Sequence, residues 1–127
     1  MSKKIRLKLY ETEINKLIGS ELDMTLGDNA NIIDIISEID KMIVKRGTFP
    51  SKYYGSLLHW VYNPAEKRFY ESMAINAFTE SNEFMNIRNE PHTTIPNNSK
   101  IILIPGGPCT SSHDKLLSYE EFKRLMK

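Results

Sequence analysis

The length, composition and charge of the chain suit one globular domain and exclude several classes of protein. A chain of 127 residues, 40% of them apolar and 26% charged, suffices for one hydrophobic core. Seventeen basic against sixteen acidic residues give a net charge of +1, so no global field would attract nucleic acid or an anionic membrane. Cys109 is the only cysteine, which excludes an intramolecular disulfide. The first residues lack the apolar run of a signal peptide or spanning helix, and we expect a cytoplasmic protein without a membrane segment.

The N-terminal residues predict two antiparallel strands. From residue 3 to about residue 10, basic and apolar side chains alternate, which is typical of a strand with one solvated and one buried face. The alternation returns from Leu22 to Leu26, where Asp23 and Thr25 separate the apolar residues. Each of these strands should therefore offer one apolar face to the core.

The next segment predicts an amphipathic helix that covers this pair of strands. Residues 27–29 end the second strand, and Asn31 stands at the expected N-cap with Asp34 three positions later. Five isoleucines then recur at helical spacing on one face: Ile32, Ile35, Ile36, Ile39 and Ile43. Such a stripe needs a sheet to bury it, and the order strand, strand, helix is how a β-grasp domain begins.

A loop and a hairpin rich in aromatic residues are expected next. The periodic pattern lapses after the helix, and Leu58, Trp60 and Tyr62 then alternate up to a turn signal at residues 63–67. Apolar residues alternate again after this turn. We therefore predict a hairpin of roughly residues 57–78.

The C-terminal part of the chain predicts a central strand and a short helix. A helical turn is expected around residues 84–87, within a polar segment. Residues 101–104 form a continuous apolar run, which favours a strand buried on both faces and stops at Pro105-Gly106-Gly107-Pro108. Ser118 and Glu121 have the spacing of a capping box, which indicates a short terminal helix.

The order of these segments resembles the ubiquitin-like sulfur carriers, a family that includes the small subunit of molybdopterin synthase and the thiamine-pathway carrier. The first strand and the following Leu17-Ile18-Gly19 are similar to the family's opening segment. "LGDNANIIDIISEI" looks like its turn and capped helix, and "MAINAF" like the strand before its Val-Asn-Gly turn, with Ala77 where glycine is usual. "TTIPNNSKIILIP" is similar to the segment that leads into its last strand.

The resemblance implies a fold, a site and a partner. The fold would be α+β of the β-grasp type, a mixed sheet of four to five strands crossed by one main helix. Residues 1–107 would form this domain, with an insertion at about 45–72, and 108–127 would be an extension. Gly106 and Gly107 would be the carrier C-terminus, whose carboxylate an adenylating enzyme activates or a larger catalytic subunit receives. The chain itself would hold no catalytic residue, metal or cofactor.

The residues around the glycine pair also allow a plainer interpretation. Only Pro105 separates the pair from the last strand, Pro108 follows at once, and twenty residues lie beyond Gly107. A free carboxylate at Gly107 would therefore require proteolysis. Without it, the Pro-Gly-Gly-Pro segment would only reverse the chain direction.

Two functions of different classes follow from these observations. The first is a sulfur carrier or protein modifier that is trimmed to the glycine pair. The second is a non-conjugating β-grasp module or accessory subunit that binds a protein through its aromatic residues and sheet surface. Its candidate contact residues are Tyr53, Tyr54, Trp60 and Tyr62, and their density favours a protein or structural contact over nucleic acid.

The histidines and the cysteine do not indicate a further site. His59, His92 and His113 are spaced too widely for a local metal motif, and no charged or helix-terminal setting for Cys109 can be identified. We therefore expect no zinc site and an inert cysteine.

Overall fold

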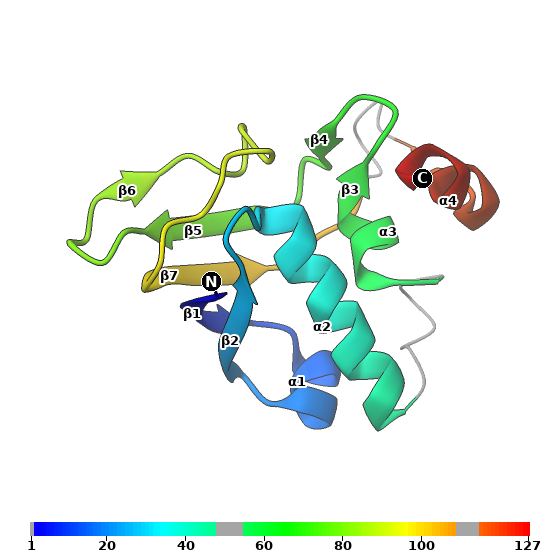
Figure 1. The fold of residues 1–127 in the computed structure, drawn as a ribbon. Coiled ribbons are helices and arrows are strands. Elements are labelled where there is room, and N and C mark those ends of the chain that lie inside the picture. Colours follow the sequence, from blue (N-terminus) through cyan, green and yellow to red (C-terminus); the bar gives the residue numbers. More distant parts are fainter. Residues whose placement is uncertain (1, 48–54, 109–114) are drawn as a thin grey trace.

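The computed structural model describes residues 2–47, 55–108 and 115–127. They form an α+β fold in which a five-stranded mixed sheet is covered on one face by the long helix α2, Ile32–Arg46 (Figure 1). The prediction of one main helix across a mixed sheet is confirmed at this level. No helix in the described ranges is both long and apolar enough to span a membrane.

The sheet has the strand order β2-β1-β7-β5-β6. The predicted antiparallel pairing of the first two strands is confirmed, and β1 is also parallel to β7, next to which β5 and then β6 follow antiparallel. The bounds of the strands are β1 Ser2–Leu9, β2 Glu21–Gly27, β5 Ala74–Phe78, β6 Phe84–Met85 and β7 Ser99–Ile104. A parallel pair needs a crossover connection, and the chain that leaves β2 through α2 provides it.

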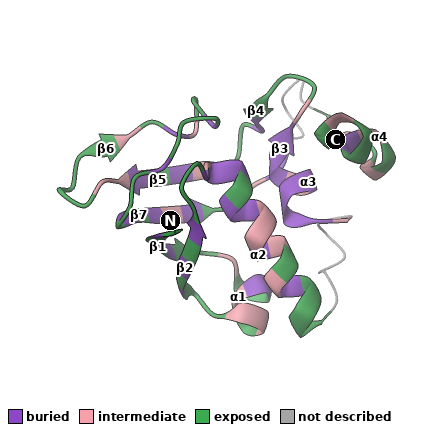
Figure 2. Ribbon diagram, in the orientation of Figure 1, coloured by how far each residue is buried: buried purple, intermediate pink, exposed green. Residues whose placement is uncertain are grey.

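Helix α2 begins where the sequence predicts and buries its isoleucine stripe. The Asn31 side chain accepts from the Asp34 backbone N–H, and the Asp34 carboxylate accepts from that of Asn31, so the capping box is complete. The buried residues of α2 are Ile32, Ile33, Ile35, Ile36, Ile39 and Ile43. Figure 2 shows buried residues along α2 and on the strands, which together form the core.

A short helix and a buried lysine fix the ends of the first hairpin. Helix α1, Thr12–Ile18, joins β1 to β2 and ends at Gly19, whose φ of 89° favours glycine. Lys3 is buried, and its ammonium donates to the backbone carbonyls of Asp28, Ala30 and Ile95. The buried charge is therefore solvated by backbone dipoles of the segments before α2 and before β7.

The predicted strand around Trp60 is wrong, because Leu57–Val61 forms the short helix α3. The Asp40 carboxylate of α2 accepts the backbone N–H groups of Leu57 and Leu58, at 2.7 and 3.2 Å. The Ser56 hydroxyl oxygen accepts a hydrogen bond from the backbone N–H of His59. These long-range and local caps satisfy the first N–H groups of a helix, and they cannot be inferred from an alternating pattern.

The predicted hairpin of residues 57–78 is likewise much smaller. Only β3, Tyr62–Asn63, and β4, Arg68–Phe69, pair with each other, as a separate two-stranded sheet. The turn at residues 63–67 is confirmed, and the Asn63 side chain accepts backbone N–H groups within it. The later residues instead enter the main sheet as β5.

Two further predictions near the end of the sheet need correction. Residues 84 and 85 form the strand β6, not part of a helical turn. In β7 the burial alternates, since Ile101 and Leu103 are buried, Ile102 is half-buried and Ile104 is 43% exposed. Because α2 covers only one face of the sheet, β7 is buried on that face alone.

The predicted C-terminal helix is confirmed as α4, Tyr119–Met126. The Ser118 side chain accepts from the Glu121 backbone N–H at its N-terminus. Phe122 is buried, and its ring lies 5.3 Å from that of His59, measured between centroids. The C-terminal extension therefore packs on the rest of the domain through α3.

Candidate functional site

The glycine pair lies against the domain body. A β-carbon on Gly106 would collide with the backbone carbonyl of Ser72. One on Gly107 would lie 2.5 Å from Cε2 of the Trp60 indole, and Gly107 is buried. The segment after β7 therefore packs closely on α3 and on the residues before β5, and this packing requires glycine at both positions. A mobile carrier tail requires the opposite arrangement, a segment free to leave the surface.

The four aromatic contact candidates do not form one exposed surface in the described part of the chain. Trp60 is half-buried beneath Gly107, and Tyr62 is buried with its ring edge-on to Phe69 at a centroid distance of 5.3 Å. Burial raises the pKa of the Tyr62 hydroxyl. Tyr53 and Tyr54 lie outside the described residues. As placed, Trp60 and Tyr62 serve packing.

His59 and Asp40 link α2, α3 and α4. His59 is buried against the rings of Tyr119 and Phe122, and its Nε2 donates to the carbonyl oxygen of Leu117 at 2.5 Å. Burial raises the pKa of Asp40 to about 6, against the lowering effect of its two backbone hydrogen bonds. Asp40 thus holds α3 and the Nε2 of His59 holds the segment before α4, whereas the buried Nδ1 of His59 has no hydrogen-bond partner in the described part of the chain.

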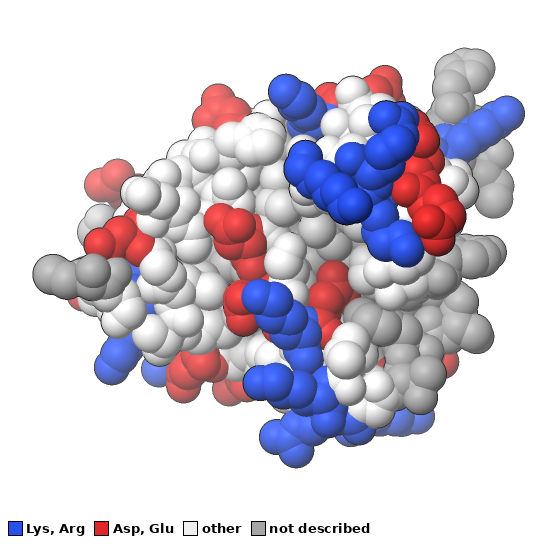
Figure 3. Space-filling view, turned by 45° about the vertical axis from the view of Figure 1, so that its right-hand side comes forward, with Lys and Arg blue, Asp and Glu red and all other residues white. Residues whose placement is uncertain are grey.

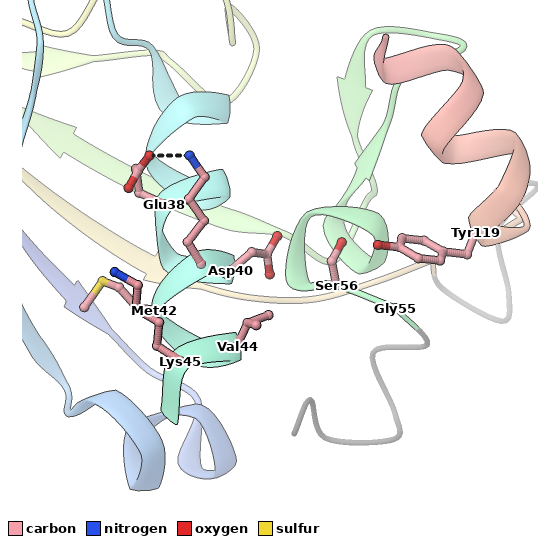
Figure 4. A pocket seen from close by; sticks show the side chains of 9 residues that line it. Glu38, Asp40, Met42, Val44, Lys45, Gly55, Ser56 and Tyr119 are labelled. Atoms are coloured by element: carbon pink, nitrogen blue, oxygen red, sulfur yellow. Dashed lines mark hydrogen bonds and ion pairs between the residues drawn. The ribbon is translucent and has the colours of Figure 1, made fainter. Parts of the chain in front are cut away.

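A groove lies between α2 and the start of α3 (Figure 4). Its volume is about 530 Å³; Asp40 faces it from α2, and Ser56 and Tyr119 lie on the opposite side, before α3 and on α4. A β-carbon on Gly55 would lie 2.7 Å from the Tyr119 ring, so α4 also packs tightly here. Val44 is 63% exposed on the α2 side. Among its described lining residues, Glu38 pairs with Lys41, and Asp40 accepts the N–H groups of α3, so these groups are engaged in the fold.

The face of the sheet that α2 leaves open carries a different kind of surface. Cross-strand pairing places Phe84, Phe78, Lys100, Arg6 and Asp23 in one row across five strands. The rings of Phe78 and Phe84 meet edge-on at 5.9 Å, and Phe84 is 60% exposed. This row therefore has apolar residues at its β6 end and basic residues in its middle, on the outward face of the main sheet.

Neighbouring rows extend both parts of this face. In one row Ile102 lies between Lys8 and Asn76, and in another Ile104 lies beside Ala74. We call these outward rows the open face. Its exposed or half-buried residues include Lys4, Arg6, Lys8, Glu21, Asp23, Thr25, Ala74, Asn76, Phe78, Phe84, Lys100, Ile102 and Ile104. Exposed apolar side chains that cluster in this way mark contact sites more often than isolated ones do.

The electrostatics of the open face differ between its two edges. On the β2 edge, Asp23 pairs with Arg6 at 3.3 Å and Glu21 with Lys8 at 3.8 Å, both exposed. Lys100 donates to the Asn82 side chain. Figure 3 shows another side of the molecule, that of α2 and α4, where basic groups also have acidic groups beside them, in line with the small net charge.

The described residues contain no group of three His, Cys, Asp or Glu side chains that could hold a metal ion. Comparisons with protein-family models, with curated proteins and with solved structures found no match to this chain. The residues of the open face and the packing of the glycine pair are the features of the described structure that bear on function.

Sequence reasoning did not identify Phe78 and Phe84 as site residues. Phe84 was assigned to a helical turn in a polar segment, and its pairing with β5 depends on contacts distant from the local pattern. The basic alternate positions of β1 were recognisable as a solvated face. What the sequence alone does not reveal is that β7 and β5 place apolar residues beside them.

Proposed function

We propose that this chain is a non-conjugating protein-binding module of the β-grasp type, which acts as an accessory subunit through the open face of its sheet. The strand order β2-β1-β7-β5-β6, with the parallel pair β1 and β7 joined through α2, supports the β-grasp assignment. The β-grasp assignment therefore rests on this topology and on the resemblance of the ordered sequence segments.

The observation that carries the proposed binding function is the set of exposed apolar side chains in two parts of the open face, at the Phe78–Phe84 pair and at Ile104 further along β7. Phe84 is 60% and Ile104 43% exposed, although each stands on a strand of the main sheet where it could have been polar at no cost to the core. Burial of such side chains against a partner is favourable by about 25 cal/mol per Å² of apolar area. A contact surface explains why these positions are apolar.

The packing around the glycine pair supports a module that works at full length. Carrier chemistry would require removal of residues 108–127, and with them Tyr119 and Phe122, whose rings both pack on the buried His59 ring. It would also require Gly107 to leave the Trp60 ring. Both steps would expose apolar surface that the full-length chain buries.

The proposal is tested by comparing two single variants of full-length protein expressed with an affinity tag in its native cells. Phe84→Ser removes an exposed ring of the open face, and Val44→Ser is the matched control, an equally exposed apolar residue on α2. A protein that co-purifies with wild type and with Val44→Ser but is lost with Phe84→Ser is expected. A partner retained by Phe84→Ser and by Ile104→Ser would contradict the proposal.

A further inference from the structure

We infer that the open face binds an acidic segment of a partner protein, about ten to twelve residues long, with apolar side chains at one end and carboxylates at the other. This inference rests on the proposed function and adds the chemistry and polarity of the partner. It follows from the order of side chains along one row of the sheet.

The row begins with apolar residues and continues with cations. From the β6 edge inward, cross-strand neighbours are Phe84, Phe78, Lys100 and Arg6. Three strand spacings of about 4.8 Å separate the first from the last, roughly 14 Å in all. A helix rises 1.5 Å per residue, so about ten residues cover that distance. A segment of this length can place an apolar residue over the phenylalanines and carboxylates over Lys100 and Arg6.

The charges beside the row limit where the carboxylates can lie. Beyond Arg6 the row ends at Asp23, and Glu21 occupies the same edge beside Lys8. Because Arg6 and Lys8 are already paired with these two acids, an acidic partner is repelled by this edge and is attracted mainly to Lys4 on β1 and Lys100 on β7. The partner therefore lies over β1, β7 and β5 and not over β2.

The same charges disfavour the two main alternative occupants. One alternative is a dimer in which two open faces pack on each other. A two-fold axis parallel to the rows would place β1 of one copy against β1 of the other, and thus cations against cations. An axis parallel to the strands would place the acidic β2 edge against the phenylalanines of the other copy. A nucleic acid would meet Asp23 and Glu21 at one edge, and the net charge of +1 gives it no wider attraction.

A hollow on the open face lies at the cationic part of the row. It has a volume of about 610 Å³, and Lys4, Arg6 and Lys100 contribute to its lining. The acidic residues Glu80 and Asp23 also line it, so the hollow contains both basic and acidic side chains. A carboxylate in this hollow would meet Lys4 and Lys100 on β1 and β7, away from the Arg6–Asp23 ion pair.

The experiment selects ligands for full-length protein from a phage-displayed library of random 16-residue peptides. We expect the enriched peptides to combine apolar residues with Asp or Glu, and to bind wild type and Val44→Ser equally. Phe84→Ser and Lys100→Glu should each weaken them at least tenfold, and binding should weaken as NaCl is raised. Replacing the peptide's critical carboxylate by Lys should restore binding to Lys100→Glu, which identifies the pair.

Any other outcome contradicts the inference. The outcomes differ in whether they also contradict the proposed function. Peptides that depend on Phe84 but lack acidic residues would contradict the acidic partner and leave binding by the open face standing. Peptides insensitive to both Phe84→Ser and Ile104→Ser would contradict both. The inference also fails if no peptide is enriched, if a single-stranded 20-nucleotide DNA binds more tightly than the peptides, or if the protein dimerises through this face.

Discussion

Gly107 packs directly on the indole ring of Trp60, with 2.5 Å between a β-carbon built on residue 107 and Cε2 of the ring. This contact joins the segment after β7 to α3, which in turn holds α4 through His59. The pair that resembles a carrier terminus is thus one of the places where the C-terminal segment is fixed to the domain.

Gly107→Ala should destabilise the protein, because the added methyl group overlaps the Trp60 ring. We expect a loss of about 1–3 kcal/mol in the free energy of unfolding, measured by urea denaturation. Gly27→Ala is the matched control, since no atom lies within 4 Å of its β-carbon, and it should change stability by less than about 0.5 kcal/mol. Equal effects of both substitutions would show that the Trp60 contact is not tight.

Removal of the α4 anchor should cost a similar amount. Phe122→Ala deletes a buried ring that covers His59, and we expect a loss of about 1.5–3 kcal/mol. A chain that ends at Gly107 should lose at least as much, because it lacks Tyr119 as well. Arg124→Ala, on the exposed side of α4, is the control. If the truncated chain unfolds at the same urea concentration as full-length protein, α4 does not stabilise the domain.

The fold could be predicted in those parts where local pattern and tertiary environment agree. The alternation in β1 and β2 and the isoleucine stripe of α2 are reliable because each element buries one face against the other. The alternating pattern of residues 57–61 predicts a strand, but these residues form a helix, because the carboxylate of Asp40, seventeen residues earlier, caps it. A sheet surface is predicted as the contact area, but the placing of Phe78 and Phe84 on it depends on which strands are neighbours.

The stability of the protein should depend on pH through Asp40. Its pKa is raised from 3.8 to about 6 in the folded state, so folded protein binds the proton more tightly than unfolded protein. At about 1.4 kcal/mol per pKa unit, Asp40 contributes about 3 kcal/mol below pH 4, which is lost as the pH rises through 6.

Comparison with Asp40→Asn isolates this effect. The variant does not titrate at residue 40, so the stability of wild type minus that of Asp40→Asn should fall between pH 4 and pH 6 and level off above pH 7. Urea unfolding at several pH values measures it. A difference that stays constant over this range would show that the pKa of Asp40 is the same in both states.

Lys3→Met should destabilise the protein although it replaces a buried charge by an apolar residue. The carbonyl groups of Asp28, Ala30 and Ile95 lose a charged donor, and we expect a cost of about 1–3 kcal/mol. Lys4→Met, at the adjacent exposed position, should change stability by less than about 0.5 kcal/mol. A Lys3→Met protein as stable as wild type would mean that the three carbonyls find water instead.

The intact mass of the protein isolated from its native cells tests the central claim most directly. A module that acts through its open face, with the glycine pair packed on Trp60 and α4 docked, is expected to keep every residue from 108 to Lys127. The measured mass should therefore include the complete C-terminal segment. A species that ends at Gly107, or one about 16 Da heavier because sulfur replaces a carboxylate oxygen, would contradict the account and establish carrier chemistry.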